Sequence, residues 1–489
     1  MNRWYRPGAV SAVLLGLLLS ACVLPPKDEP TQKPITANRL GLDGAAVPPA
    51  AEGWWKQYKD PQLDSLVAQT LDENPVLATV MTRIRSAQAQ ASLAQAGQLP
   101  QLGLDASATR QHFPEQYIYP PPYAGNEWWT GDVGVNLSWD LDLFGRQAAL
   151  IEQAKDQVQA AALDARTARL AIAGVLAQSY LDLYRADALA DIATQSEQQR
   201  EHILALTRKR VAAGLDTNVE LREAEGALPQ ARLAKLQAEV SAELAKHKLA
   251  ALANRGGAQA YAEIHRPQVD LEAALPLPQQ LPADLLARRP DILAAKASVE
   301  AATAGRRAAH QAFYPDVNLS ALAGLQAIGL SNLFEASSRS LSVGPALHLP
   351  LFDAGRLEAG YHAATAGLDS AIAQYNQTVL YAVQQVADQL SKVDSYNKQL
   401  VQARAAQQSA EEAYRLADKR YSAGLTNYLV VLNAETQVLT ARRAVVDTLS
   451  NQAIARVSLL LAIGGDFTPP PASQQTADAS PHNTPNPAQ

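Results

Sequence analysis

Residue types that could carry out catalysis are scattered along this sequence. It has eight histidines and one cysteine in 489 residues, and the histidines show neither a His-Glu-x-x-His motif nor a comparable metal-binding spacing. The sequence has no phosphate-binding glycine loop and no Gly-x-Ser-x-Gly nucleophile motif. We therefore predict that the protein is not an enzyme and that it binds no cofactor and no metal ion.

The single cysteine, Cys22, cannot form a disulfide within the chain. It follows two arginines and an apolar run over residues 9–19, which is too short to span a bilayer but typical of a secretory signal. The segment Leu19-Ser20-Ala21-Cys22 resembles a bacterial lipobox, which implies a lipidated Cys22. Val23 after it implies sorting to the outer membrane. The alternative is a cysteine that packs as a small hydrophobic residue.

The chain contains an internal duplication. Pro75 and Pro100 bracket a segment of unbroken helical composition, and Pro290 and Pro315 bracket another, 215 positions further along. Beyond these segments, matching residues lie 210 positions apart. Two repeats of about 200 residues indicate one duplicated unit rather than a solenoid of short repeats.

Each repeat contains two segments in which apolar and polar residues alternate, the pattern of a strand with one apolar face. These segments cover about residues 102–108, 133–143, 317–325 and 341–351. Their lengths are similar to the 9 to 11 residues with which a tilted strand crosses a bilayer. Polar positions expected to face water in the second segment are Asn136, Ser138, Asp140 and Asp142.

Residues 111–130 and 326–339 are predicted to be loops between the paired strands. The first loop is rich in Tyr, Trp and Pro. Aromatic side chains with a polar tip favour a membrane interface, and a cluster that packs on itself is the alternative.

Each strand pair precedes a long proline-free helical stretch, which runs to about Lys209 in one repeat and about Lys419 in the other. Each stretch has about 65 residues and would be about 100 Å long. A heptad seam typical of a coiled coil occurs in the second: Val379, Val383, Val386, Leu390, Val393, Asn397 and Leu400. Both stretches end at a glycine turn, at Gly214 and Gly424, after which helix resumes.

Four strands cannot close a membrane barrel, and an open sheet edge in lipid leaves backbone groups unpaired. Several chains must therefore share the barrel. Two chains would give eight strands and a filled lumen, whereas three would give twelve strands and an aqueous passage. We expect an internally duplicated α+β membrane protein: a trimeric 12-stranded β-barrel with four strands per chain, continued by a long coiled-coil α-helical barrel. An amphipathic sheet in a soluble sandwich is the alternative.

Several motifs, taken in order, resemble the outer-membrane channel component of tripartite efflux pumps, in its lipoprotein subgroup. The resemblance covers about residues 19–465. It rests on Trp54-Trp55, Asp60-Pro61, Arg289-Pro290-Asp291, Phe352-Asp353-Ala354-Gly355-Arg356 and Arg420-Tyr421 followed by Gly424-Leu425.

The resemblance implies a homotrimer in the bacterial outer membrane, anchored by lipid and spanning the membrane, with a long periplasmic portion. Its partners would be a periplasmic adaptor protein, an inner-membrane transporter and outer-membrane lipid. The composition implies no nucleic acid, since the net charge is −6. The function expected is a passive exit duct for drugs or other small toxic compounds. The alternatives are a channel for protein secretion and a lipid-anchored coiled-coil scaffold without a pore.

The resemblance also implies the site residues. The adaptor-facing turns would contain Val211, Ala213, Gly214 and Leu215 in the first repeat and Tyr421, Ala423, Gly424 and Leu425 in the second. Leu429 and Asn433 would line the periplasmic constriction.

The resemblance also shows a departure at this constriction, because many family members carry Asp at the position of Asn433 and some carry another where Val430 stands. Asp216 and Glu223 are the other candidates for negative charge near the turns, and solvated surface carboxylates are the alternative for both.

The predicted organisation starts with a lipoprotein signal peptide over residues 1–21 and a lipidated lead-in over residues 22–51. The first repeat covers residues 52–253, a linker covers 254–281, and the second repeat covers 282–465. Residues 466–489 have the composition of a disordered tail.

Overall fold

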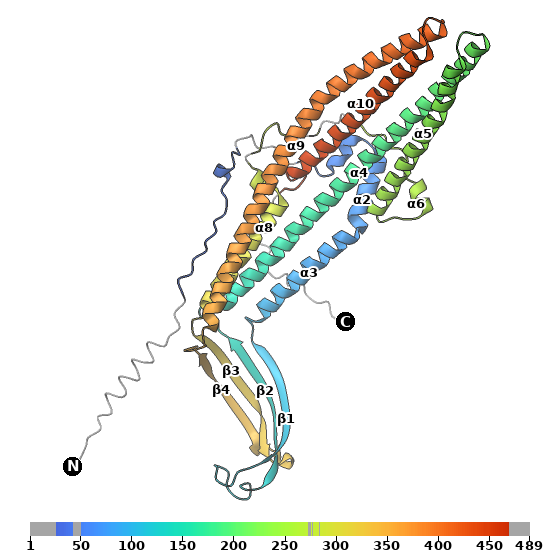
Figure 1. Ribbon diagram of the computed structural model, residues 1–489. Coiled ribbons are helices and arrows are strands. Elements are labelled where there is room, and N and C mark those ends of the chain that lie inside the picture. The colour runs from blue at the N-terminus through green and yellow to red at the C-terminus, as the bar shows by residue number, and fades with distance from the viewer. Residues whose placement is uncertain (1–25, 43–49, 272–274, 276, 283, 469–489) are drawn as a thin grey trace. The chain divides into compact units, whose positions relative to one another are not determined.

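The computed structural model describes residues 26–42, 50–271, 275, 277–282 and 284–468 (Figure 1). The predicted signal peptide, Cys22 and most of the predicted tail lie outside these residues. The described chain is mostly helical and has one four-stranded sheet. None of its described helices combines the length and the apolar character needed to cross a membrane.

The chain passes through the same series of long elements twice. The first series is α2 Pro61–Glu73, α3 Pro75–Ala96, β1 Gln101–His112, β2 Glu127–Asp140, α4 Arg146–Ala212 and α5 Asn218–Leu252. After the short helix α6 Ala258–Ala262, the second is α7 Leu285–Arg288, α8 Pro290–Gln311, β3 Asp316–Ile328, β4 Arg339–His348, α9 Arg356–Ser422 and α10 Tyr428–Ala462. Helices α4 and α9 have 67 residues each, and α5 and α10 have 35 each.

The chain divides into two compact units. The first contains the described residues up to 34 together with residues 83–161 and 295–375, and therefore the whole sheet. The second contains residues 35–82, 162–294 and 376 onward, and therefore both glycine turns.

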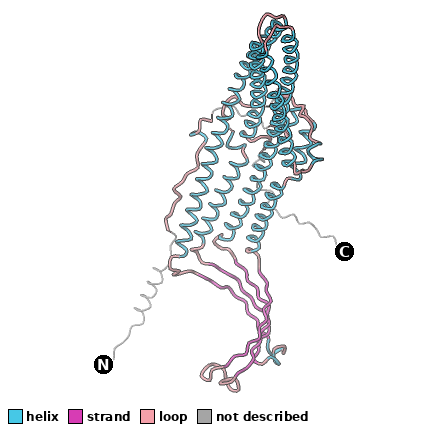
Figure 2. Tube along the Cα trace, turned by 45° about the vertical axis from the view of Figure 1, so that its right-hand side comes forward, coloured by secondary structure: helices cyan, strands magenta, loops and turns pink. Residues whose placement is uncertain are grey.

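The sheet of the first unit is antiparallel, with its strands in the order β1-β2-β3-β4 (Figure 2). In-register rows of residues cross all four strands and alternate in character. One row is Leu104, Val135, Ala323 and Leu341, and the next is Asp105, Gly134, Gly324 and Ser340. The predicted four strands, each with one largely apolar and one largely polar face, are therefore confirmed.

Glycine allows the strands to approach closely on the polar face. Gly134 lies opposite Gly324, and a Cβ atom added at Gly324 would lie 2.4 Å from the carbonyl oxygen of Val133. Gly103 and Gly344 lie on the same face. Small residues on one face permit a sheet to curl toward that face, and the strands bend together in Figure 2.

Two predicted boundaries of the second strand were wrong. Trp128, Trp129 and Thr130 belong to β2 rather than to a loop, since Trp129 pairs with Arg110 of β1. Asp142, predicted as a water-facing strand residue, lies beyond the end of β2 with a φ of 44°. Its carboxylate accepts hydrogen bonds from the backbone N–H groups of Gln147 and Ala148, both at 2.8 Å. Asp142 thus stabilises the start of α4, because the first N–H groups of a helix have no partner within the helix.

The Trp54–Pro61 motif forms part of the core of the second unit. Trp54 is fully buried, and Asp60 caps α2 by accepting a hydrogen bond from the Gln62 N–H at 2.9 Å. The second carboxylate oxygen of Asp60 accepts from the Tyr180 hydroxyl at 2.8 Å and from the Gln268 N–H at 2.7 Å. The motif therefore joins the start of α2 to α4 and to the segment after α6.

Arg289 has a comparable role before α8. Its guanidinium donates to both carboxylate oxygens of Asp291, to the Ala462 carbonyl at 2.9 Å and to the Gln385 side chain at 2.9 Å. The buried arginine thereby holds the end of α10 beside the start of α8.

An extended segment of the first unit, residues 26–34, is held against α8 and α9. The Asp28 carboxylate lies 2.7 Å from Nδ1 of His362, and the Asp28 carbonyl accepts a hydrogen bond from Arg306. The Asp369 carboxylate accepts from the N–H groups of Thr31 and Gln32 at 3.2 and 2.8 Å. We call this segment the N-terminal strap.

We predict that the attachment of the N-terminal strap depends on pH. The hydrogen bond to Asp28 raises the pKa of His362 above its usual value. The ion pair therefore contributes its full stabilisation below about pH 6.5, the ordinary histidine pKa, and loses it as pH rises through the raised pKa. Asp28→Asn should speed amide hydrogen exchange of residues 26–34 at pH 6, and the difference from the unmodified protein should shrink at pH 8.

The control is Asp394→Asn, which removes an exposed α9 carboxylate paired with Lys398 at 2.6 Å. It should leave exchange of the strap unchanged. A difference of the same size at both pH values would contradict the role given to His362.

Candidate functional site at the two helix turns

The turns after α4 and α9 have the same backbone geometry. Gly214 and Gly424 have φ values of 73° and 79°, in the left-handed region that glycine adopts without strain. The Leu215 N–H donates to the Arg210 carbonyl at 2.9 Å, and the Leu425 N–H donates to the Arg420 carbonyl at 2.8 Å. A hydrogen bond from the N–H of the sixth residue to the carbonyl of the first is typical of a Schellman motif, which explains why each long helix ends there.

Both return helices begin at a side-chain cap. Thr217 and Glu220 form a reciprocal capping box at the start of α5, and the Asn427 side chain accepts from the Val430 N–H at the start of α10. Each turn is therefore defined from both sides, by glycine before it and a polar cap after it.

A buried polar network joins the two turns. The Arg210 guanidinium donates to both carboxylate oxygens of Asp216, at 2.8 and 2.9 Å, and to the Tyr421 carbonyl at 2.8 Å. It also lies over the Tyr421 ring, 4.5 Å from its centroid. The Tyr421 hydroxyl donates to Asp216 at 2.8 Å and lies 2.8 Å from the Thr207 hydroxyl. We call these four residues the turn network: Thr207, Arg210, Asp216 and Tyr421.

The turn network lies beside an apolar cluster with members from α4, α5, α9 and α10. The cluster contains Ile203, Leu204, Ala224, Ala417, Tyr421, Tyr428 and Val431. The side chains of Arg210 and Asp216 are only 9% and 6% exposed. A bidentate pair with so little water access is much stronger than a surface ion pair, and losing one partner leaves a buried charge.

The electrostatics of the network follow from these contacts. Hydrogen bonds from Arg210 and then from Tyr421 lower the pKa of Asp216. Burial raises the pKa of Tyr421 to about 12, further above neutral pH than the ordinary value of about 10. Because Asp216 is paired with Arg210 and its side chain is only 6% exposed, the alternative of a solvated surface carboxylate is wrong for this residue. Glu223 is exposed.

The two turns differ at positions related by the duplication. Arg420 corresponds to Arg210 but is exposed, and Thr426 stands where the first repeat has Asp216. Because threonine has no charge, the second turn cannot form the same ion pair. Each pair of helices joined by such a turn, α4–α5 or α9–α10, is a helical hairpin. Of the two turns, only the first contacts the other helical hairpin through a charged side chain, Arg210.

Most predicted turn residues are accessible. Ala213 and Ala423 are exposed, Leu215 and Leu425 are 65% and 69% exposed, and Val211 is half-buried. Tyr421 differs from the expectation of an adaptor-facing side chain, because it is fully buried. As a member of the turn network, Tyr421 joins the two helical hairpins instead.

The predicted constriction residues lie on the first turns of α10. Leu429 is 51% exposed, Val430 is 47% exposed and Asn433 is exposed, whereas Tyr428 and Val431 are buried. Leu429 and Asn433 are four residues apart and therefore share one face of the helix. Val219, which corresponds to Leu429 in the first repeat, is 65% exposed. The turns thus present exposed apolar side chains, whereas the polar turn network is buried.

Sequence reasoning missed the burial of Glu435. This residue is fully buried and lies 3.3 Å from Nε of Arg200 and 3.5 Å from the Ser196 hydroxyl, both on α4. Burial raises its pKa. Its spacing from the buried residues Val431 and Val438 could have indicated an inward position. Glu225, its counterpart in the first repeat, pairs instead with Arg222.

Metal binding has no support in the described part of the chain, where no group of three or more His, Cys, Asp or Glu side chains could hold an ion.

Comparison with known proteins identifies relatives along nearly the whole chain. The family described as "Outer membrane efflux protein" matches residues 66–255 and 281–465. The chain is 34% identical over 467 residues to the outer membrane protein OprJ of Pseudomonas aeruginosa, covering 94% of this chain and 96% of that protein. It is 36% identical over 370 residues to the fusaric acid resistance protein FusA of Burkholderia cepacia, covering 74% of this chain and 69% of that protein.

A solved structure shares the fold. The outer membrane protein VceC of Vibrio cholerae superimposes with a TM-score of 0.80 at 34% identity, covering 86% of this chain and 100% of that chain.

We predict that Asp216→Asn loosens both turns. The substitution leaves Arg210 buried without its charged partner, a change that costs about 3 kcal/mol in comparable buried pairs. Amide hydrogen exchange around residues 210–217 and 420–427 should become about 100-fold faster, if these segments open locally. Tyr421→Phe removes only a hydroxyl and should cost about 1 kcal/mol.

The matched control is Arg420→Ala in the second turn. Because Arg420 is exposed, the substitution should change local stability by less than about 0.5 kcal/mol. Equal effects of Asp216→Asn and Arg420→Ala would contradict the importance of the buried pair.

Proposed function

Because the chain belongs to the outer membrane efflux protein family, we infer that it forms the outer-membrane exit duct of a tripartite efflux system. The duct releases drugs or other small toxic compounds that an inner-membrane transporter supplies through a periplasmic adaptor protein. OprJ and VceC are named as outer membrane proteins, and FusA is named for fusaric acid resistance. The duct carries out no catalytic step.

The two unsatisfied edges of the sheet are the observation that carries this proposal. Within the described residues, β1 pairs only with β2 and β4 only with β3. An open edge in lipid costs several kcal/mol for each unpaired backbone group. Three copies joined edge to edge, β4 of one against β1 of the next, give twelve strands around an aqueous lumen.

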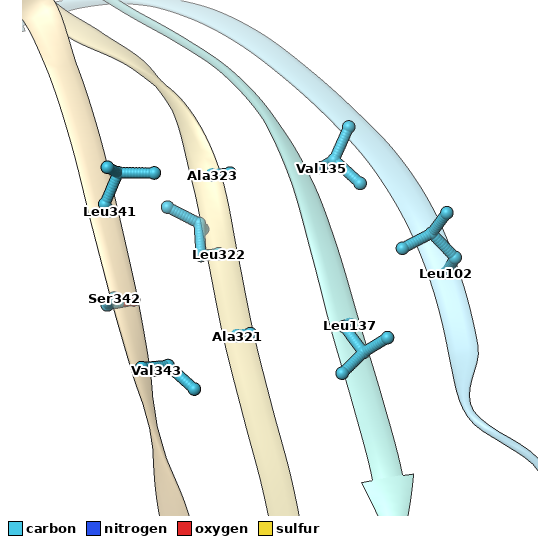
Figure 3. Close-up of a pocket in the computed structure, with 9 residues that line it drawn as sticks. All are labelled: Leu102, Val135, Leu137, Ala321, Leu322, Ala323, Leu341, Ser342 and Val343. Atoms are coloured by element: carbon cyan, nitrogen blue, oxygen red, sulfur yellow. The ribbon is translucent and has the colours of Figure 1, made fainter.

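The exposed apolar face of the sheet supports a lipid-facing position. Leu102, Leu341 and Val343 are 72%, 79% and 77% exposed. Figure 3 shows them together with Val135, Leu137, Ala321 and Ala323, which lie on the same apolar rows. A patch that crosses a whole sheet is uncommon on soluble monomers, whereas it fits the outer wall of a membrane barrel.

Aromatic residues at both ends of the sheet fit the two membrane interfaces. At the helix end, Phe144 and Tyr314 stack with their centroids 5.2 Å apart, and Trp139 is 37% exposed. At the opposite end of the sheet, where loops join β1 to β2 and β3 to β4, the rings of Tyr123 and Trp128 make an edge contact with their centroids 5.4 Å apart. Such rings favour the headgroup level.

The turn network supports a gate at the periplasmic end. At rest, Arg210 and Tyr421 hold the two hairpins together. A shift to a second packing opens the tunnel, and adaptor contacts with the exposed turn residues bias the equilibrium between the two states. Leu429 and Asn433 then line the narrowest part. Acyl chains at Cys22 supply an additional anchor, since several chains bind a membrane far more firmly than one.

Planar-bilayer recordings on the purified full-length protein test the duct directly. We expect small conductance steps from the unmodified protein and a higher open fraction for Asp216→Asn, because the substitution weakens the turn network through which Arg210 and Tyr421 hold the two helical hairpins together. Single-particle images should show three-fold symmetric hollow particles. A monodisperse, folded monomer without conductance would exclude the duct and favour a scaffold.

Resistance assays test the role of the glycine turn in cells. Gly424 has a φ of 79°, so Gly424→Ala should strain the turn by about 1 kcal/mol and lower resistance to drugs that the system exports. Gly367→Ala is the matched control, because Gly367 lies within α9 with no atom near the added Cβ. Normal resistance in the Gly424→Ala strain, at equal protein level, would count against this turn's role.

A further inference from the structure

Glu435 is a buried carboxylate with incomplete hydrogen bonding. Its side chain has no exposed surface. One oxygen, Oε1, lies 3.3 Å from Nε of Arg200 and 3.5 Å from the Ser196 hydroxyl, longer than the roughly 2.7 to 2.9 Å of most charge-assisted hydrogen bonds. The other oxygen, Oε2, has no hydrogen-bond partner within the described residues. The site therefore compensates poorly for the water that an ionised carboxylate loses on burial.

The contact between Glu435 and Arg200 joins the two helical hairpins. Glu435 belongs to α10, and Arg200 belongs to α4. The Arg200 side chain is 14% exposed, and it also donates to the Ala227 carbonyl of α5 at 3.5 Å. Glu435 therefore shares this cation with a second acceptor. The contact has no residue in common with the turn network.

The equivalent carboxylate of the first repeat has different surroundings. Glu225 lies 2.8 Å from Arg222 of α5 and 3.5 Å from Arg208 of α4, and its side chain is 30% exposed. Both arginines belong to the same helical hairpin as Glu225. The carboxylate that is buried between the two helical hairpins is thus that of the second repeat.

Other titratable and charged groups lie around Glu435 or its neighbours. They are Tyr414, Asp418 and Glu411 of α9, Tyr428 and Arg442 of α10, and Glu223 of α5. Burial raises the pKa of Tyr414 to about 12 and raises that of Tyr428 above its usual value, so neither tyrosine titrates near neutral pH. Arg442 is already paired with Glu411 at 2.8 Å. Arg200 is therefore the cation that opposes the charge of Glu435.

Protonation of Glu435 stabilises the joined arrangement of the helical hairpins. Burial raises the pKa of Glu435, and the opposing effect of Arg200 is smaller. When the helical hairpins separate and water reaches the carboxyl group, its pKa returns toward the ordinary value of about 4.3. The joined arrangement thus binds the proton more tightly. It gains stability as pH falls through the raised pKa and loses that stability as pH rises.

We propose that Glu435 makes the periplasmic gate sensitive to protons, so that acid closes the duct more firmly than neutral pH does. This inference rests on the proposed duct and on its gate between the helical hairpins. A neutral carboxyl group is tolerated between α4 and α10, whereas an ionised one favours an arrangement in which water reaches it. The turn network does not supply this response, because the pKa of Asp216 is lowered and the carboxylate stays ionised.

Planar-bilayer recordings between about pH 5 and about pH 8 test the proposal on the purified full-length protein. We expect the ratio of open to closed time to rise with pH, by at most about tenfold per pH unit for each titrating Glu435. Glu435→Gln should remove most of this rise and keep the duct closed, because glutamine resembles the neutral carboxyl group. An unchanged pH profile in the Glu435→Gln protein would overturn the proposal.

Arg200→Gln distinguishes a proton response from a merely structural contact. Removing the cation raises the pKa of Glu435 further, so the midpoint of the pH response should move to higher pH. Loss of a structural contact alone would change the open fraction by the same factor at every pH. Glu225→Gln is the matched control, because it removes the carboxylate at the equivalent position of the first repeat and should leave the pH profile unchanged.

Amide hydrogen exchange separates this inference from the duct itself. After correction for the intrinsic effect of pH on exchange, residues 428–438 should be more protected at about pH 5.5 than at about pH 7.5. This difference should vanish in the Glu435→Gln protein. Conducting trimers without the difference would overturn the role of Glu435 and leave the duct intact. A folded monomer without conductance would overturn the duct and this inference with it.

Discussion

Backbone hydrogen bonding at the edges of the four-stranded sheet is the constraint on which the rest depends. Strands β1 and β4 each have one side without a partner in the described chain, and both faces of the sheet are largely exposed. In water such edges are a risk of aggregation, and in lipid they are prohibitive. The same edges become interfaces when identical chains meet, which explains why a four-stranded protomer is consistent with a membrane protein.

The duplication provides two sets of matching elements, and sequence differences between the two repeats make their turns differ. The two long helices have equal lengths and end at the same glycine motif. Charge then distinguishes them, because Asp216 is matched by Thr426 and buried Arg210 by exposed Arg420. Within the first helical hairpin, the Arg210–Asp216 pair positions the groups that bind Tyr421 of the second, through the Tyr421 carbonyl and hydroxyl. A contact of this kind suits a two-state element, because it is strong when complete and costly when one partner is lost.

Much of the fold could be predicted, because local patterns determine it. Alternation indicated all four strands, and their in-register rows agree with it. Positive φ at Gly214 and Gly424 followed from glycine in a turn between helical segments. Element ends were less predictable, as Trp128 and Asp142 show: an aromatic residue suits a strand or a loop, and an aspartate suits a polar face or a helix start. The segments that pack beside such a residue decide which element it joins.

The sequence by itself determined which elements form and which faces of the strands are apolar, since both depend on the spacing of neighbouring residues. It also excluded an excess of positive charge. Only the tertiary structure decided that Asp216 is paired, that Tyr421 is buried and that Glu435 faces Arg200. Their partners lie on other elements or depend on burial, and the energy of a charge depends on the water and the counter-charges that folding brings beside it.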